Sequence, residues 1–219
     1  MEDFFTARVQ YSKNGLIRFI GHLDTGRLIK QALRCSGLLL RYTQGFSPHI
    51  KVSFGPPLPL GFSSDCEFFD ASLEEVTDPA EIKQRIQPYL PNGLVVEKTA
   101  MLTHRPSALA RIIDHAQYRI TLPGQYYLTS EKIEKLLDST KSSKADDAEK
   151  SMKMRSYVES LQCVDTGREG CVFEIILKDV NKSAPSIKKI FAQLLEIELF
   201  EIDGAQMHRL KLWSNRQNL

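Results

Sequence analysis

Three residues in the N-terminal part of the chain have the side chains of general acid–base chemistry: His22, Asp24 and His49. A histidine titrates near neutral pH, and a neighbouring carboxylate can orient its ring, so such a group could transfer a proton or hold a ligand. His22 and Asp24 also suit the first turn of a helix, where a negative charge stabilises the positive end of the dipole. The sequence leaves both interpretations open, catalysis and helix capping.

A second set of residues is basic. Residues 1–51 hold eight Lys/Arg and three acids, whereas residues 52–100 hold three Lys/Arg and eight acids. Arg27, Lys30 and Arg34 share one face of a predicted helix, on which we expect no acid to pair with them. Cations displace the condensed counterions of nucleic acid, and arginine can bind phosphate through two hydrogen bonds. The pattern is typical of phosphate binding, although a merely solvated helix face would look the same.

An aromatic side chain stands in a polar turn close to these cations in the sequence. The turn reads Gln44-Gly45-Phe46-Ser47-Pro48-His49. An exposed phenyl ring could stack on a base, as aromatic residues do in many modules that bind RNA or single strands. Alternatively, glycine and proline only set the backbone angles of a strand bulge here. From the first interpretation we predict a nucleic-acid-binding set made of Arg18, Arg27, Lys30, Arg34, Arg41, Gln44, Phe46, Ser47 and Lys51.

The sequence contains no recognisable cofactor or metal motif. The four cysteines form no Cys-x-x-Cys pair, and the Walker, dinucleotide-binding, nucleophile-elbow and zinc-protease motifs are absent. The spacing of the histidines and cysteines matches no zinc pattern. We therefore expect neither a cofactor nor a metal.

The sequence also bears on where the protein is found. The chain starts Met1-Glu2-Asp3, without the positive charge of a signal peptide, and no apolar run approaches the roughly 20 residues of a membrane span. We expect free thiols, no membrane and a cytoplasmic location.

The elements that position these residues follow from hydrophobic periodicity and turn signals. In the N-terminal half we predict a helix that opens at Gly21–Asp24, with Gly37 as its left-handed C-cap. A second helix is predicted from Pro79 to Tyr89. The predicted extended segments are Phe5–Ser12, Leu16–Ile20, Leu38–Thr43, Ile50–Phe54, Glu67–Leu73 and Leu94–Met101.

The C-terminal half repeats this order of elements. We predict strands over 116–122, 152–164, 171–180 and 205–213, with helices over 129–137 and from Pro185 onward, and a mobile polar loop over 139–151. The order β-α-β-β-α-β is that of a ferredoxin-like domain with an antiparallel sheet. We therefore predict an α+β protein of two tandem ferredoxin-like domains, residues 1–102 and 115–219, joined by a linker over 103–114.

Several segments resemble one bacterial family, the radical SAM-linked proteins. The segments are R-F-I-G-H-L-D (Arg18–Asp24), Y-T-Q-G-F-S-P-H-I-K-V-S-F (Tyr42–Phe54) and P-L-P-L-G (Pro57–Gly61), with weaker matches over Ser107–Ile120 and Met207–Leu210. Gly21 departs from the serine that is usual there. Members of that family are encoded beside radical S-adenosylmethionine enzymes or fused to them. The resemblance implies such an enzyme as a partner, and it implies no activity.

Three hypotheses follow. The first is an accessory module that binds tRNA or rRNA through the N-terminal half and presents it to a separately encoded radical SAM enzyme. The second is an enzyme that acts on RNA or a small anionic substrate, with His22, Asp24 and His49 as acid and base. The third is a protein adaptor that docks on the radical SAM enzyme through an apolar sheet face.

Overall fold

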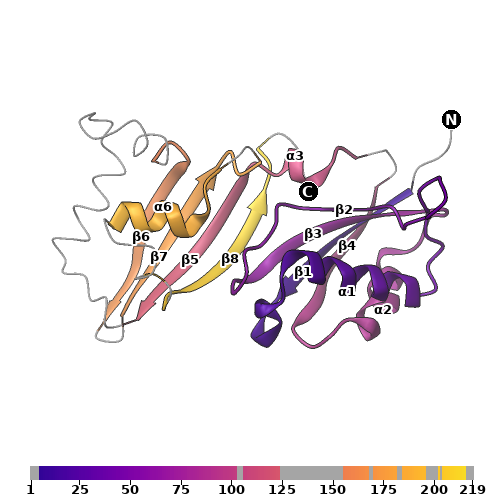
Figure 1. Cartoon of the computed structure of the whole chain (residues 1–219), viewed down its shortest axis with the longest axis horizontal. Coiled ribbons are helices and arrows are strands. Elements are labelled where there is room, and N and C mark those ends of the chain that lie inside the picture. Colours follow the sequence, from indigo (N-terminus) through magenta and orange to yellow (C-terminus); the bar gives the residue numbers. More distant parts are fainter. Residues whose placement is uncertain are drawn as a thin grey trace. The chain divides into compact units, whose positions relative to one another are not determined.

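The structure is a computed structural model that describes residues 5–102, 106–123, 155–167, 170–181, 184–195, 202 and 204–215. The fold is α+β, as predicted, and the chain divides into two compact units, Met1–Ile113 and Asp114–Leu219 (Figure 1). The short helix α3 (Leu109–Ile112), predicted as part of the linker, packs on unit 1. Leu109 and Ile113 are fully buried there, which places this segment in the fold of unit 1.

Unit 1 is an antiparallel sheet with two helices on one face. Its strands pair in the order β4-β1-β3-β2, and its helices α1 and α2 lie together on one side of them (Figure 1). The elements are β1 (Phe5–Lys13), α1 (His22–Cys35), β2 (Val52–Phe54), β3 (Ser63–Leu73), α2 (Pro79–Ile86) and β4 (Leu94–Leu102).

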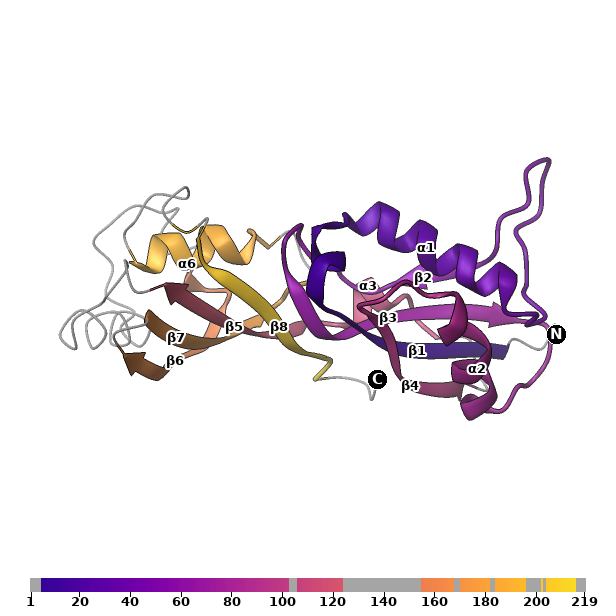
Figure 2. The same cartoon turned by 90° about the horizontal axis from the view of Figure 1, so that it is seen from below.

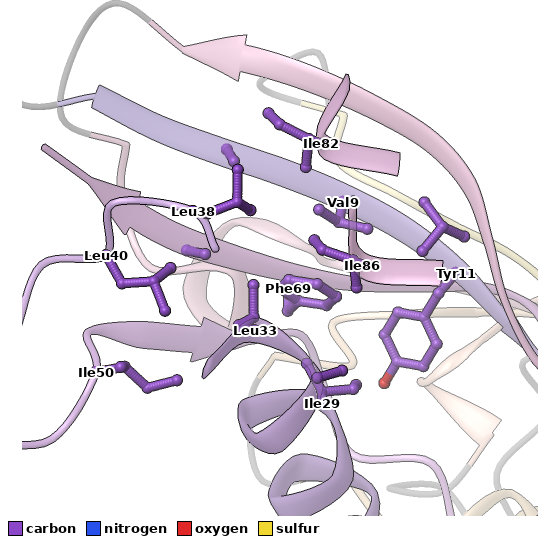
Figure 3. Close-up of a cluster of buried hydrophobic side chains, with 14 of the residues drawn as sticks. Val9, Tyr11, Ile29, Leu33, Leu38, Leu40, Ile50, Phe69, Ile82 and Ile86 are labelled. Carbon is purple, nitrogen blue, oxygen red and sulfur yellow. The ribbon is translucent and has the colours of Figure 1, made fainter. Parts of the chain in front are cut away.

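The core of unit 1 lies between the sheet and these helices. On β1, Ala7, Val9 and Tyr11 point into it, because successive side chains of a strand alternate between the two faces. From α1 and α2 come residues spaced three and four apart, such as Ile29 and Leu33, which form the apolar stripe of each helix (Figure 3). The alternate residues of β1, Thr6 and Arg8, therefore lie on the opposite face of the sheet.

The predicted ends of α1 agree with the structure. Asp24 lies in its first turn, and Gly37, just past the C-terminal end, has a φ of 71°. Gly21 is the N-cap and provides no side-chain hydrogen bond, which fits the absence of a serine there. The second helix is also confirmed. α2 ends at Ile86 and continues as the 3-10 helix η2 (Gln87–Tyr89), and the Asp78 side chain accepts hydrogen bonds from its first backbone N–H groups.

Two extended segments were predicted wrongly. Leu16–Ile20 is not extended: residues Gly15–Phe19 form the 3-10 helix η1, closed by the Ile20 N–H, which donates to the Ile17 carbonyl. Leu38–Thr43 is not a full strand, because it makes only isolated bridges, one of them between Leu40 and Leu73. Apolar runs this short do not by themselves distinguish a strand from a helical turn or an irregular segment.

Unit 2 repeats the strand order of unit 1. The pairing order is β8-β5-β7-β6, and all pairs are antiparallel. The helix α6 (Ile187–Leu195) packs its apolar side on this sheet, with Phe191 edge-on to Phe173 at 5.5 Å between ring centroids. The strands are β5 (His115–Pro123), β6 (Val158–Gly167), β7 (Gly170–Lys178) and β8 (Gln206–Trp213).

The predicted helix over 129–137 and loop over 139–151 lie outside the described residues. Within the described part of the chain, no helix has the length and apolar content needed to cross a bilayer.

Candidate nucleic-acid interface

The turn that contains Phe46 forms a closed loop between α1 and β2. At its base, the Lys51 N–H donates to the Arg41 carbonyl at 2.9 Å. One step further out, the Thr43 N–H donates to the His49 carbonyl at 2.8 Å, and the His49 N–H donates to the Thr43 Oγ1 at 3.0 Å. These bonds hold the two arms of the loop together, so residues 44–48 form its tip.

The tip of this loop is open to solvent. Residues 42–49 are all exposed, and the Phe46 ring is fully so. Figure 2 shows the loop rising beyond the C-terminal end of α1, on the side of the sheet that α1 covers. A phenylalanine on a hydrogen-bonded loop costs hydrophobic free energy when left in water, so a binding partner would gain by covering it.

The basic stripe on α1 lies on the outer side of the helix. Arg27 and Arg34 are exposed, and Lys30 is half-buried. The expectation that no acid pairs with this stripe is wrong: Arg27 forms an ion pair with Asp24 at 2.7 Å, one turn earlier. Both side chains are largely exposed, so water screens this pair and a phosphate could compete for the guanidinium.

The other predicted cations are not gathered with the stripe. Arg18 lies in η1, at the opposite end of α1 from the loop, with its guanidinium 4.7 Å from the centroid of the Phe19 ring. Arg41 stands at the base of the loop. Lys51 follows the core residue Ile50 and lines a cleft on the face of the sheet that the helices do not cover. The structure therefore brings the α1 stripe and the loop to one side and places Lys51 on the other.

The three residues predicted as acid and base are also separated. His22 begins α1 and contacts the Phe54 ring edge-on, with 5.9 Å between centroids. Asp24 forms an ion pair with Arg27, and His49 belongs to the loop that lies beyond the other end of α1 (Figure 2). Since the 14 residues of α1 span about 20 Å, this arrangement does not form one proton-transfer group.

Sequence reasoning missed a buried ion pair in unit 1. Arg8 on β1 donates through Nε and Nη2 to the two carboxylate oxygens of Asp70 on β3, both at 2.8 Å. The two residues are directly opposite in the strand register, and both are buried. Their separation of 62 residues hides the pair from any local pattern.

It also missed a histidine cluster in unit 2. The His115 ring stacks on Trp213 with 5.2 Å between centroids. Its Nδ1 lies 2.6 Å from Asp114 Oδ1, and its Nε2 lies 3.3 Å from Asn215 Nδ2 and 3.5 Å from Glu159 Oε2. The Asp-His dipeptide was the only local signal, because Glu159 comes from β6, Trp213 ends β8 and Asn215 follows it.

The cysteines remain free thiols. Cys66 and Cys171 are buried, Cys35 is exposed, and burial raises the pKa of the Cys163 thiol, whose Sγ donates to the Asp165 carbonyl. Among the residues that the structure describes, no three His, Cys, Asp or Glu side chains come together in a way that could hold a metal ion.

A protein-family model matches residues 6–188 of the chain. Its description reads "Uncharacterized protein conserved in bacteria (DUF2344)". The chain belongs to this family. The match confirms the predicted membership of a conserved bacterial family, and its description does not mention radical SAM enzymes, so that link stays a prediction.

No curated protein matches the chain. Among solved structures, it is similar to a chain of the archaeal box H/ACA sRNP Nop10-Cbf5 complex, with 11% identity and a TM-score of 0.47 over 93% of this chain. It spans about half, 46%, of that chain. It is also similar to a mutant chlorite dismutase from Candidatus Nitrospira defluvii, with 9% identity and a TM-score of 0.27, covering 94% of this chain and 91% of that one. With TM-scores this low, neither similarity carries an argument about function.

Proposed function

We propose that the protein is an RNA-binding module, and that the loop after α1 and the outer face of α1 form its interface. The observation that supports this most is the exposure of Phe46 at the tip of a loop whose base is hydrogen-bonded. A ring held in this way can stack on an unpaired base without first being ordered, and stacking tolerates any base.

The α1 stripe would add phosphate contacts beside the stacked base. Arg34 lies in the last turn of α1, next to the loop, and Lys30 and Arg27 continue the row towards the other end. Gln44 and Ser47 flank Phe46 and are exposed, so they can donate or accept hydrogen bonds with base edges or ribose. The proposed ligand is an unpaired segment of tRNA or rRNA.

The test is fluorescence anisotropy with a labelled single-stranded RNA over a series of salt concentrations. We expect Phe46→Ala to weaken binding by about tenfold or more, as loss of one base stack does. Replacing Arg27, Lys30 and Arg34 by glutamine should reduce the slope of log K against log salt by about 0.7 for each lost phosphate contact.

Matched controls are available on unit 1. Tyr89 is an exposed aromatic residue in η2, and Lys83 is an exposed cation on α2, both outside the proposed interface. Tyr89→Ala and Lys83→Gln should bind RNA as the wild type does. Failure to bind at low salt, a binding constant that does not change with salt, or equal losses in Phe46→Ala and Tyr89→Ala would contradict the proposal.

The partner and the finer fold class are also part of this proposal. We infer from the segment resemblances that the bound RNA is presented to a radical SAM enzyme encoded separately. We also infer that each unit is ferredoxin-like. Two observations support this. The strands of both units pair in the same order, β4-β1-β3-β2 in unit 1 and β8-β5-β7-β6 in unit 2, and both helices of unit 1 lie on one face of its sheet.

A protein adaptor is the second candidate. The predicted apolar sheet face does not suit it in unit 1, because that face carries Thr6, Arg8 and Asp70. Apolar side chains are instead exposed where η1 meets α1, namely Leu16, Phe19 and Leu23. The exposed Leu60 belongs to the same region, because the N–H of the next residue, Gly61, donates to the Arg18 carbonyl. Such a patch suits a protein partner. Co-purification of the radical SAM enzyme without nucleic acid would favour this candidate.

A further inference from the structure

An open cleft of about 590 Å³ lies in unit 1 on the face of the sheet that α1 and α2 leave uncovered. Thr6 of β1 and Asp70 and Ser72 of β3 form its floor, since these positions alternate with the core residues of the same strands. Lys51 and Ser53 form one side of it. The volume is within the range of pockets that hold small molecules.

The charge of this cleft is positive. Asp70 lies on the floor, but the guanidinium of Arg8 meets both of its oxygens at 2.8 Å, so the pair is close to neutral. Among the described lining residues, this leaves the ammonium group of Lys51 as the net charge. Each Asp70 oxygen still has a lone pair that can accept a further hydrogen bond.

The floor of the cleft also contains the hydroxyl group of Thr6. Thr6 is 5% exposed, and within the described residues no protein group forms a hydrogen bond with its side chain. The same holds for the side-chain hydroxyls of Ser53 and Ser72. All three hydroxyls can therefore donate and accept hydrogen bonds in the cleft, so they favour a ligand with several hydrogen-bonding groups of its own.

We propose that this cleft binds the ribose phosphate of a ribonucleotide. Lys51 binds the phosphate, and Asp70 with the three hydroxyls binds the ribose hydroxyls. Pro106, which also lines the cleft and is half-buried, offers apolar surface to the base. The ligand can be a free nucleotide or the end of an RNA chain. The site does not depend on the RNA interface proposed above, because it lies on the opposite face of the sheet.

Isothermal titration calorimetry on the full chain tests this, with adenosine, AMP, ribose 5-phosphate and a short RNA with or without a 5′-phosphate. We expect AMP and ribose 5-phosphate to bind one site. Adenosine should bind about tenfold more weakly, because it lacks the charge that Lys51 meets. Competition of the 5′-phosphorylated RNA with AMP would assign the site to an RNA end, and its absence would assign the site to the free nucleotide.

Variants locate the binding. Lys51→Met should weaken AMP binding by about tenfold, and Thr6→Val and Ser53→Ala by a few-fold each. Lys83→Met on α2 is the matched control and should leave the affinity unchanged. Ser53 is half-buried on the three-residue strand β2, so its variant remains informative if Thr6→Val does not fold.

Two results would overturn the proposal. One is the absence of saturable binding by AMP and ribose 5-phosphate. The other is an unchanged affinity in both Lys51→Met and Ser53→Ala, which would mean that the cleft holds only water. Phe46→Ala separates the two proposals, since it should weaken RNA stacking and leave AMP binding intact. Loss of RNA binding therefore does not imply loss of AMP binding, nor the reverse.

Discussion

Lys13 lies at the end of β1 with its side chain almost completely buried. Its ammonium group donates to the Ile20 carbonyl, and the carboxylate of Glu67 is close enough to favour its charge. Burial outweighs this attraction, so the pKa of Lys13 falls below its ordinary value of 10.5. A lysine in this position suggests a structural role, because it satisfies a carbonyl of the chain between η1 and α1.

The lowered pKa predicts a pH dependence of stability. Between the folded-state pKa of Lys13 and 10.5, the unfolded chain binds more protons than the folded one, so this residue makes stability rise with pH there. Below the folded-state pKa, both states are protonated and the contribution is constant. Urea unfolding of the wild type and Lys13→Met should therefore show a free-energy difference that moves in favour of the wild type as pH rises, by at most about 1.4 kcal/mol per pH unit.

Lys98 on β4 provides the control for this measurement, because its side chain is exposed. Lys98→Met should show no such trend over the same pH range. A difference between wild type and Lys13→Met that stays constant up to pH 10.5 would show that burial does not disfavour the charge of Lys13.

At the scale of elements, the turn before β4 packs closely against the end of β1 at Gly93. Gly93 has a φ of 93°, and its carbonyl accepts a hydrogen bond from the Asn14 N–H at 2.8 Å. A Cβ at this position would lie 2.3 Å from the Asn14 carbonyl oxygen and 2.9 Å from Ile17 Cγ2. The turn before β4 therefore needs glycine for both its backbone angle and its space.

Gly93→Ala should be strongly destabilising, and Gly15→Ala is its matched control. Gly15 also has a positive φ, of 66°, but a Cβ there meets nothing within 4 Å. We expect Gly15→Ala to cost about 1 kcal/mol for its backbone angle alone, and Gly93→Ala to cost at least about 2 kcal/mol more. Thermal unfolding followed by circular dichroism measures both, and equal losses would refute the steric argument.

At the scale of the whole molecule, each unit has its own buried core. The core cluster of unit 1 draws all its members from residues 5–101. Leu109 and Ile113 add two fully buried side chains, and a Cβ on Gly55 would lie 3.5 Å from Ile113 Cδ1. Unit 1 should therefore fold without unit 2, provided that α3 is retained.

Two fragments test this. Residues 1–113 should unfold cooperatively in urea, as small single domains do. Residues 1–102, which end at the boundary predicted from the sequence, should be less stable by several kcal/mol, because removing a buried leucine or isoleucine usually costs about 2–5 kcal/mol. Equal stability of the two fragments would show that α3 is only a connection, and the absence of a cooperative transition in 1–113 would show that unit 1 depends on unit 2.

The sequence alone determined the features that depend on neighbouring residues. The 3.6-residue spacing of Ile29 and Leu33, with Gly37 after them, predicts α1 and its end, and the Asp78-Pro79 pair predicts the start of α2. Strand alternation likewise predicts β1, β3 and β4. These signals are local, because a helix face or a strand face is set by the backbone geometry of the segment itself.

Only the tertiary structure decided which of these residues meet. It paired Arg8 with Asp70, placed His22 and His49 at opposite ends of α1, and turned Lys51 away from the α1 stripe into a cleft. It also left Phe46 in solvent, although phenylalanine is usually buried. The physical reason is that contacts between residues far apart in the chain depend on strand register and on the order of strands in the sheet. A shift of one residue in the register reverses which face a side chain occupies, and no local pattern records it.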